Sequence, residues 1–254
     1  MLHANGGFES ISHMSKGPFT LALGTFLSFL GMTLSFYLLP LGVVLLIIAL
    51  LIWGKENLTK KFSLEGLKTA AWPFIEISNM KLGVWIFLFG EVLLFSSLLG
   101  SYLFIRAQIP NWPTLGEIFD IKIASINTFL LITSSFTAML ALNSIRRGER
   151  EGLKVGLIIT LALGFLFLIN KGVEWEELIK QGLTPNSSLP GTIFFTITGI
   201  HAAHVFAGLM VLIYLLLRSE SFSKEKYESV EYFDLYWNFV DIVWLFIFPL
   251  LYLI

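Results

Sequence analysis

The chain has 254 residues, of which 56 % are hydrophobic and only 14 % are charged, and its mean hydropathy is +0.78. Because soluble domains carry about 25 % charged residues, this composition excludes an ordinary soluble protein and indicates an integral membrane protein. The net charge of −1 argues against a nucleic-acid partner. The absence of cysteine excludes disulfides and thiolate metal ligands.

The first part of the sequence predicts a polar tail followed by two short transmembrane helices. Residues 1–17 are polar and rich in glycine, with neither an apolar core nor a small-residue cleavage site, so we expect no cleaved signal peptide. Residues 19–54 are almost continuously apolar but are interrupted at 39–42 (LPLG). Because proline lacks a backbone N–H and disfavours helix in the preceding residue, we predict a tight turn there between two spans within residues 18–54. One long, kinked helix is the alternative.

The rest of the chain predicts five further transmembrane helices, which brings the total to seven. Each apolar run is long enough to cross a bilayer core of about 30 Å at about 1.5 Å per residue. The longest polar connection, residues 55–81, is the expected boundary between a two-helix unit and a five-helix unit at 82–254. The five predicted spans are 84–105, 123–145, 155–175, 192–217 and 232–254.

The basic residues divide unevenly between the two sides of this topology. Only Arg106, Lys122, Lys171 and Lys180 fall on the side opposite the N-terminus, which leaves 13 of the 17 Lys and Arg residues on the N-terminal side. Cytoplasmic loops carry an excess of Lys and Arg. The sequence therefore predicts a cytoplasmic N-terminus and an external C-terminus.

Glu91 lies about halfway along the predicted span 84–105. A carboxyl group near the midplane of a bilayer costs several kcal/mol unless it is neutral or paired, so it marks a candidate functional site. Glu91 could stay protonated and donate a hydrogen bond within the bundle, in a structural or regulatory role. It could instead exchange protons with a cavity, as carboxylates in membrane proton relays do.

Two histidines, His201 and His204, lie in the span 192–217 with an i, i+3 spacing that places them on one helix face. They could hold a metal if other ligands converged on them, or they could be packed and hydrogen-bonded to neighbouring helices. We favour the packed pair, because no second histidine motif occurs in the predicted spans. Haem and copper centres need several intramembrane histidines, so we expect no redox cofactor in this chain.

The remaining intramembrane polar residues are few. Asn127 and the hydroxyl residues of the same span predict helix-packing contacts. Lys171 and Glu174 predict either an ion pair at a helix end or a contact with a lipid headgroup. Asp241 needs a partner, and a histidine or Asn127 are the candidates.

Three segments, 81–92 (KLGVWIFLFGEV), 199–205 (GIHAAHV) and 236–246 (YWNFVDIVWLF), together resemble subunit III of haem–copper oxidases in residues, order and spacing. The resemblance extends from residue 13 to the C-terminus. It implies an all-α integral membrane fold of seven transmembrane helices, arranged two plus five around a lipid-filled cleft. It also implies a subunit that carries no haem or copper and packs against the catalytic subunit I.

Residue by residue, the resemblance implies no catalytic residue and no metal ligand in this chain. It implies a contact of Lys81 with a lipid phosphate, and it makes Glu91 the proton-related candidate. The chain departs from the family at Asn238, where histidine is usual, and near Leu142 or Asn143. The lipid-binding candidates are Lys81, Glu91, Trp53, Glu174, His201 and His204, and the structural polar candidates are Asn127, Asn238 and Asp241.

We therefore expect a non-catalytic subunit III of a respiratory terminal oxidase that reduces O2 to water while pumping protons. Its partners would be the haem–copper subunit I, other oxidase subunits and phospholipid, with haem and copper held by the partner subunits and cytochrome c or a quinol as the electron donor. The expected location is a prokaryotic plasma membrane, with the mitochondrial inner membrane as the alternative. A secondary transporter, disfavoured by the lack of inverted repeats, or an intramembrane enzyme built on Glu91, His201 and His204 are the alternative functions.

Overall fold

The computed structural model describes residues 16–33, 38–59, 78–110, 112 and 121–253. These residues form seven α-helices and no β-strand, which confirms the predicted all-α membrane fold. The chain divides into two compact units, residues 1–68 and 69–254, which are described separately below. The arrangement around a cleft, and the boundaries at residues 17, 54 and 81, stay predictions.

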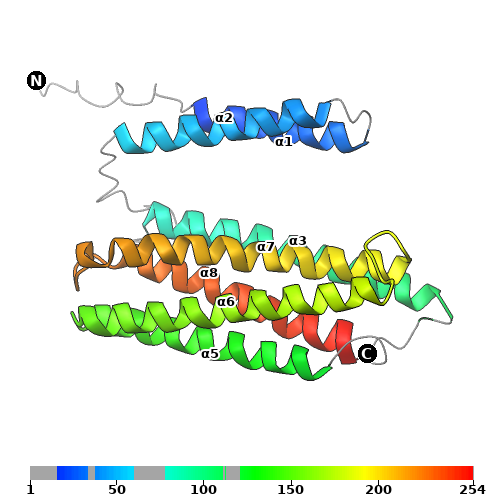
Figure 1. Ribbon diagram of the computed structural model, residues 1–254. Helices are drawn as coiled ribbons and strands as arrows, with labels where there is room; N and C mark the ends of the chain where they lie inside the picture. The colour runs from blue at the N-terminus through cyan, green and yellow to red at the C-terminus, as the bar shows by residue number, and fades with distance from the viewer. Residues whose placement is uncertain (1–15, 34–37, 60–77, 111, 113–120, 254) are drawn as a thin grey trace, which may run out of the picture. The chain divides into compact units, whose positions relative to one another are not determined.

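The first unit is a helical hairpin of α1 (Lys16–Thr33) and α2 (Leu38–Thr59), which pack along each other (Figure 1). Two helices form here, as expected, rather than one kinked helix. The predicted turn at 39–42 was placed too late, because Pro40 is the third residue of α2. The first turn of a helix tolerates proline, since N–H groups there have no partner within the helix.

Glycine allows α1 and α2 to approach closely. A Cβ atom on Gly42 would lie 2.4 Å from the backbone nitrogen of Ser28, and one on Gly24 would lie 2.9 Å from that of Leu46. No side chain fits at such distances. The hairpin is therefore packed backbone against backbone, as is common for small residues in membrane helices.

The second unit contains five helices that are long and apolar enough to cross a membrane, which confirms the five predicted spans. In the cyclic order α5, α6, α7, α8 and back to α5, each helix packs on the next, and α3 packs on α8 and α7 (Figure 1). All five helices begin a few residues before the predicted spans, and α3, α5 and α6 also end later, whereas α8 gives way at Pro249 to a π-helical end. Their bounds are α3 (Asn79–Gln108), α5 (Ile121–Arg146), α6 (Arg150–Lys180), α7 (Leu189–Leu217) and α8 (Glu228–Phe248), with a short 3-10 turn η1 (Ser219–Ser221) and a π-helical end η2 (Pro249–Leu253).

Local signals set where these helices begin and turn. The Ser78 side chain accepts a hydrogen bond from the backbone N–H of Lys81 at the start of α3, and Ser188 does the same for Gly191 at the start of α7. Both satisfy a helix N–H that would otherwise lack a partner. Gly148 follows α5 with φ +85°, a left-handed conformation that favours glycine at a helix end.

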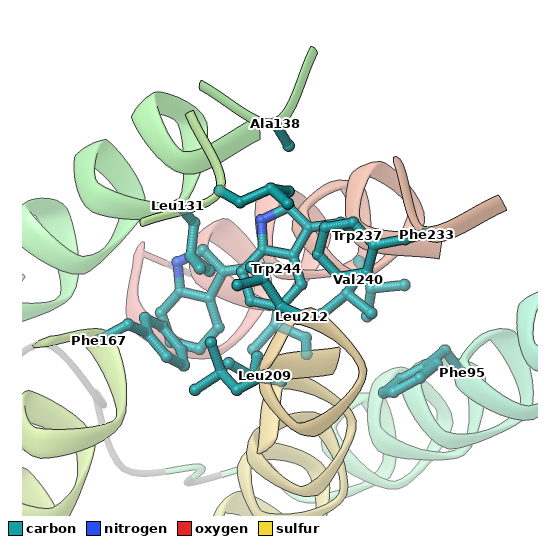
Figure 2. Packing of buried hydrophobic residues seen from close by; sticks show 14 of the residues in the cluster. Phe95, Leu131, Ala138, Phe167, Leu209, Leu212, Phe233, Trp237, Val240 and Trp244 are labelled. Carbon is teal, nitrogen blue, oxygen red and sulfur yellow. The ribbon is translucent and has the colours of Figure 1, made fainter. Parts of the chain in front are cut away.

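The core of the second unit is built around two tryptophans of α8, Trp237 and Trp244, both fully buried (Figure 2). The Trp237 indole fits between two glycines of other helices. A Cβ atom on Gly208 would lie 2.7 Å from this ring, and one on Gly164 would lie 3.0 Å from it. The two glycines therefore form the slot that admits the Trp237 side chain.

Candidate functional site

Helix α3 is joined to the rest of the second unit by polar contacts at three levels. Near its start, Lys81 pairs with Glu231 of α8 at 3.0 Å. In its middle, Glu91 Oε2 lies 3.0 Å from His204 Nε2 of α7. Near its end, the Tyr102 hydroxyl donates to the carbonyl oxygen of Leu250 at 2.8 Å. Glu91 therefore has a partner, and that partner is one of the two intramembrane histidines.

The geometry around His204 restricts where protons can lie. His204 Nδ1 is 2.8 Å from the carbonyl oxygen of Ile200, and a carbonyl can only accept, so Nδ1 carries a proton. One further proton then forms the bond between His204 Nε2 and Glu91 Oε2. With that proton on either atom the pair has no net charge, which removes most of the cost of placing a carboxylate near the midplane.

The Glu91–His204 pair is only partly covered by this chain, since the two side chains are 17 % and 19 % exposed. The Tyr236 hydroxyl of α8 donates to the backbone oxygen of His204 at 3.0 Å and fixes that turn of α7. The pair supplies the hydrogen-bonded partner that the structural interpretation of Glu91 required. Proton exchange by Glu91 stays a prediction.

His201 lies apart from this pair, in the interior of the bundle. It is fully buried, and neither ring nitrogen has a hydrogen-bond partner among the described residues. Its ring contacts those of Phe167 and Trp244, with ring centroids 5.7 Å and 5.2 Å away. In the described part of the chain, no three His, Asp or Glu side chains converge as a metal site would require. The two histidines thus have different surroundings, although they share one helix face.

Lys171 and Glu174 form an ion pair inside α6, six residues or more before its end at Lys180, and not at the helix end where the sequence placed them. Both side chains are buried, with exposed fractions of 2 % and 3 %. The Lys171 ammonium also donates to the Tyr252 hydroxyl at 2.7 Å. It lies 5.1 to 5.5 Å from the centres of three aromatic rings, those of Phe194, Trp244 and Tyr252. This geometry supports the ion-pair interpretation over a lipid contact for Glu174.

The partners of the other buried polar side chains differ from those that the sequence offered. Asp241 accepts a hydrogen bond from Ser135 at 2.6 Å, with Ser134 at 3.4 Å, and not from a histidine or Asn127. Asn127 accepts instead from Asn170 at 2.9 Å. Sequence analysis did not single out Asn170. Its only signal is that it is an amide in an apolar span, beside Lys171.

An apolar groove of about 740 Å3 lies between α3 and α8. Its lining begins at Trp85 and Leu235, each one helical turn beyond the Lys81–Glu231 ion pair, and reaches Leu103 and Leu250 at the other end. Asn238 also lines it, although its amide is bonded to the backbone of its own helix. The groove is thus apolar along its length and has charged side chains at one end.

The charged end of the groove holds two basic side chains that meet at one carboxylate. Arg146 reaches the same oxygen of Glu231 as Lys81 does, at 3.3 Å, so two cations share one carboxylate. Sequence analysis missed Arg146 and Glu231, because both fall just outside the predicted spans 123–145 and 232–254, in polar stretches with no pattern of their own. The last lipid candidate, Trp53, belongs to α2, but its side chain lies outside the described residues.

Comparison with known proteins gives one consistent result. The sequence matches the family described as cytochrome c oxidase subunit III over residues 10–254. It is 36 % identical to cytochrome c oxidase subunit 3 of Bacillus subtilis over 182 residues, which cover 70 % of this chain and 88 % of that protein. It is 34 % identical to quinol oxidase subunit 3 of Bacillus spizizenii over 174 residues, 68 % of this chain and 85 % of that protein. It is also 30 % identical over 253 residues to heme-copper oxidase subunit I+III of Aeropyrum pernix, which covers 95 % of this chain and 31 % of that longer protein.

Proposed function

This chain belongs to the cytochrome c oxidase subunit III family of haem–copper oxidases, and we propose that it is a non-catalytic subunit that binds phospholipid and supports proton uptake by a catalytic subunit I. The family assignment accounts for the multi-pass membrane fold, and no observation on the described residues favours a transporter or an intramembrane enzyme. The observation that carries the proposal is the Glu91–His204 pair. Its two ionisable side chains lie near the middle of predicted spans, in a chain for which the sequence predicts no redox centre, so we assign the pair to proton uptake.

Association with subunit I is supported by the Aeropyrum relative, whose name combines subunits I and III in one protein that matches 95 % of this chain. Haem and copper would belong to that partner. Cytochrome c or a quinol would donate the electrons, since relatives named for both kinds of oxidase match this chain. We place the complex in a prokaryotic plasma membrane with the N-terminus of this chain in the cytoplasm, as the distribution of basic residues favours.

Purification in mild detergent through a tag on this chain tests the association. We expect haem absorbance and a larger multi-span partner to copurify with it, because helices of an obligate membrane complex stay packed in mild detergent. A visible spectrum and the masses of the subunits provide the readout. A colourless preparation that contains this chain alone would contradict the proposed association.

The groove between α3 and α8 supports the proposal of bound phospholipid. Its α3 lining from Trp85 to Leu103 covers 18 residue steps, or about 27 Å at about 1.5 Å per residue, which approaches the thickness of a bilayer core. Lys81 and Arg146 stand beyond its end, where both pair with the same oxygen of Glu231. An acyl chain would fit the apolar lining, and an anionic phosphate would fit this charged end.

We expect the double variant Lys81→Ala/Arg146→Ala to retain less phospholipid after detergent washing. Each cation near an anionic headgroup contributes about 1 kcal/mol, so each loss weakens lipid binding about fivefold. Phosphorus analysis per chain measures the effect. Arg147→Ala is the matched control, because Arg147 is the neighbouring residue but is exposed and pairs with Glu149 instead. Equal lipid content in the double variant and the control would refute the proposed headgroup site.

We expect Glu91→Gln to assemble normally but to slow proton uptake or shorten the active lifetime of the oxidase, by about two- to tenfold. The glutamine amide can donate to His204 Nε2 and so keep the hydrogen bond, but it cannot release that proton. Glu176→Gln is the control, since Glu176 is an exposed carboxylate that is paired at the surface. Stopped-flow proton uptake and the number of turnovers before inactivation are the measurements. Unchanged values for both would end the proposed proton role, and complete loss of assembly would make Glu91 a structural residue.

A further inference from the structure

Phe95 of α3 stands between the apolar groove and both intramembrane histidines. It lies one helical turn after Glu91 and is only 3 % exposed. Its ring meets the ring of His204 edge-on at 5.1 Å and that of His201 at 6.4 Å. The same side chain lines the groove, and Figure 2 shows it pointing from α3 toward the buried cluster. The ring therefore covers the two imidazoles on the groove side.

His201 behind this ring has an unused hydrogen-bonding capacity. A neutral imidazole has one donor and one acceptor, and buried polar atoms are nearly always paired with protein or ordered water. Neither nitrogen of His201 is paired with a described residue, and the side chain is fully buried. An unpaired buried polar group costs free energy, so a fully apolar environment does not account for histidine at this position.

Two polar side chains near His201, those of Lys171 and His204, are already committed to other partners. The Lys171 ammonium lies against the Trp244 ring, as His201 does, and it donates hydrogen bonds to Glu174 and Tyr252. His204 has hydrogen bonds at both of its nitrogens. The carboxyl group of Glu91 uses one oxygen in its contact with His204 and retains acceptor positions. A small polar molecule near Phe95 would therefore find partners in His201 and Glu91.

We propose that Phe95 gates a water-binding site between His201 and the Glu91–His204 pair. The adjoining groove of about 740 Å3 is much larger than a phenyl ring, so the ring can rotate away from the imidazoles into it beside a mobile acyl chain. The ring contacts His201 and His204, and Glu91 is bonded to His204, so a water molecule in the space that the ring leaves would meet polar atoms on two sides, as a buried water molecule requires. The water then connects His201 to the pair that shares one proton. A role of this water site in proton uptake rests on the proposed function of the Glu91–His204 pair. The gate itself rests only on the contacts of Phe95.

Chemical modification of histidine tests the gate. Diethyl pyrocarbonate acylates imidazole nitrogens that it can reach, and fragment masses separate modification of His201 from that of His204. In the assembled complex we expect Phe95→Ala to increase the labelling rate of His201 by about tenfold or more, since the wild-type residue is reached only by local opening. Leu88→Ala is the matched control, because Leu88 is also buried on α3 and lines the same groove but has no ring to place against a histidine.

A second variant tests the same gate without removing Phe95. Val92 lines the groove beside it and is 44 % exposed, so Val92→Phe should fill the space into which the ring rotates and lower the labelling of His201 below that of the wild type. Equal labelling in Phe95→Ala and Leu88→Ala would overturn the gate. Unchanged labelling of His201 in Val92→Phe would also overturn the gate, and this variant provides the test if Phe95→Ala does not assemble. If Phe95→Ala increases the labelling of His201 but Glu91→Gln leaves proton uptake unchanged, the gate is supported and the proposed role of Glu91 in proton uptake is contradicted.

Discussion

Replacing Lys171 by methionine is expected to lower the free energy of unfolding of the second unit by about 3–5 kcal/mol. The ammonium group is bonded to Glu174 and Tyr252 inside the bundle, and both partners of the ion pair are almost fully buried. Methionine keeps most of the side-chain volume but leaves the Glu174 carboxylate without its counter-charge. An uncompensated charge in the interior of the bundle is costly, because neither a counter-charge nor bulk water stabilises it there.

Denaturation of the purified complex in increasing sodium dodecyl sulfate measures this loss. The double variant Lys171→Met/Glu174→Leu should recover most of the stability, because it removes both charges and not only one. Lys180→Met is the control from the same helix. Lys180 pairs with Glu176 at the surface, and exposed ion pairs contribute little. If Lys171→Met and Lys180→Met had the same effect, the buried pair would not stabilise the bundle.

Replacing Trp237 by alanine is expected to cost about 3–5 kcal/mol, the usual range for a large aromatic side chain removed from a packed core. The indole is fully buried between Gly164 and Gly208, which have no side chains that could move into the space. Its Nε1–H also donates to Ser134 at 3.0 Å. The variant therefore leaves a cavity and a buried hydroxyl with one hydrogen bond fewer.

The same detergent titration measures the effect of this substitution. Trp85→Ala is the control, because Trp85 is a tryptophan of the same unit but is 52 % exposed. We expect a much smaller change for it, since exposed aromatic surface in lipid loses little packing when truncated. Trp237→Phe should fall between, because phenylalanine fills part of the slot and lacks the donor. A loss of stability for Trp237→Ala no larger than for Trp85→Ala would disprove the central role of the slot.

Much of the fold follows from composition and periodicity. Apolar runs of more than 20 residues can only be satisfied in lipid as helices, since no water is present to pair with their backbone groups. The five long spans and the helical hairpin before them were therefore predictable. The turn in that hairpin was misplaced, because Pro40 signals the beginning of a helix as readily as its end.

The candidate site was predictable in its members but not in its contacts. A carboxylate or histidine in an apolar span stands out by its cost alone, which is why Glu91, His204 and Asp241 were identified. Their partners lie 106 residues or more away along the chain, as for Glu91 with His204 at a separation of 113 and Asp241 with Ser135 at 106. A helical repeat reports which face of a helix is polar, but it does not report which neighbouring helix that face meets.

The sequence by itself determined that this protein crosses the membrane as helices, and which polar residues those helices carry inside. Only the tertiary structure decided that His204 and not His201 pairs with Glu91, although both lie on one helix face. It also brought Lys81 and Arg146 together on Glu231, at the end of an apolar groove. The physical reason is that pairing depends on how α3, α7 and α8 pack, and this packing is set by side-chain shapes such as the Trp237 slot, which act across helices that are distant in sequence.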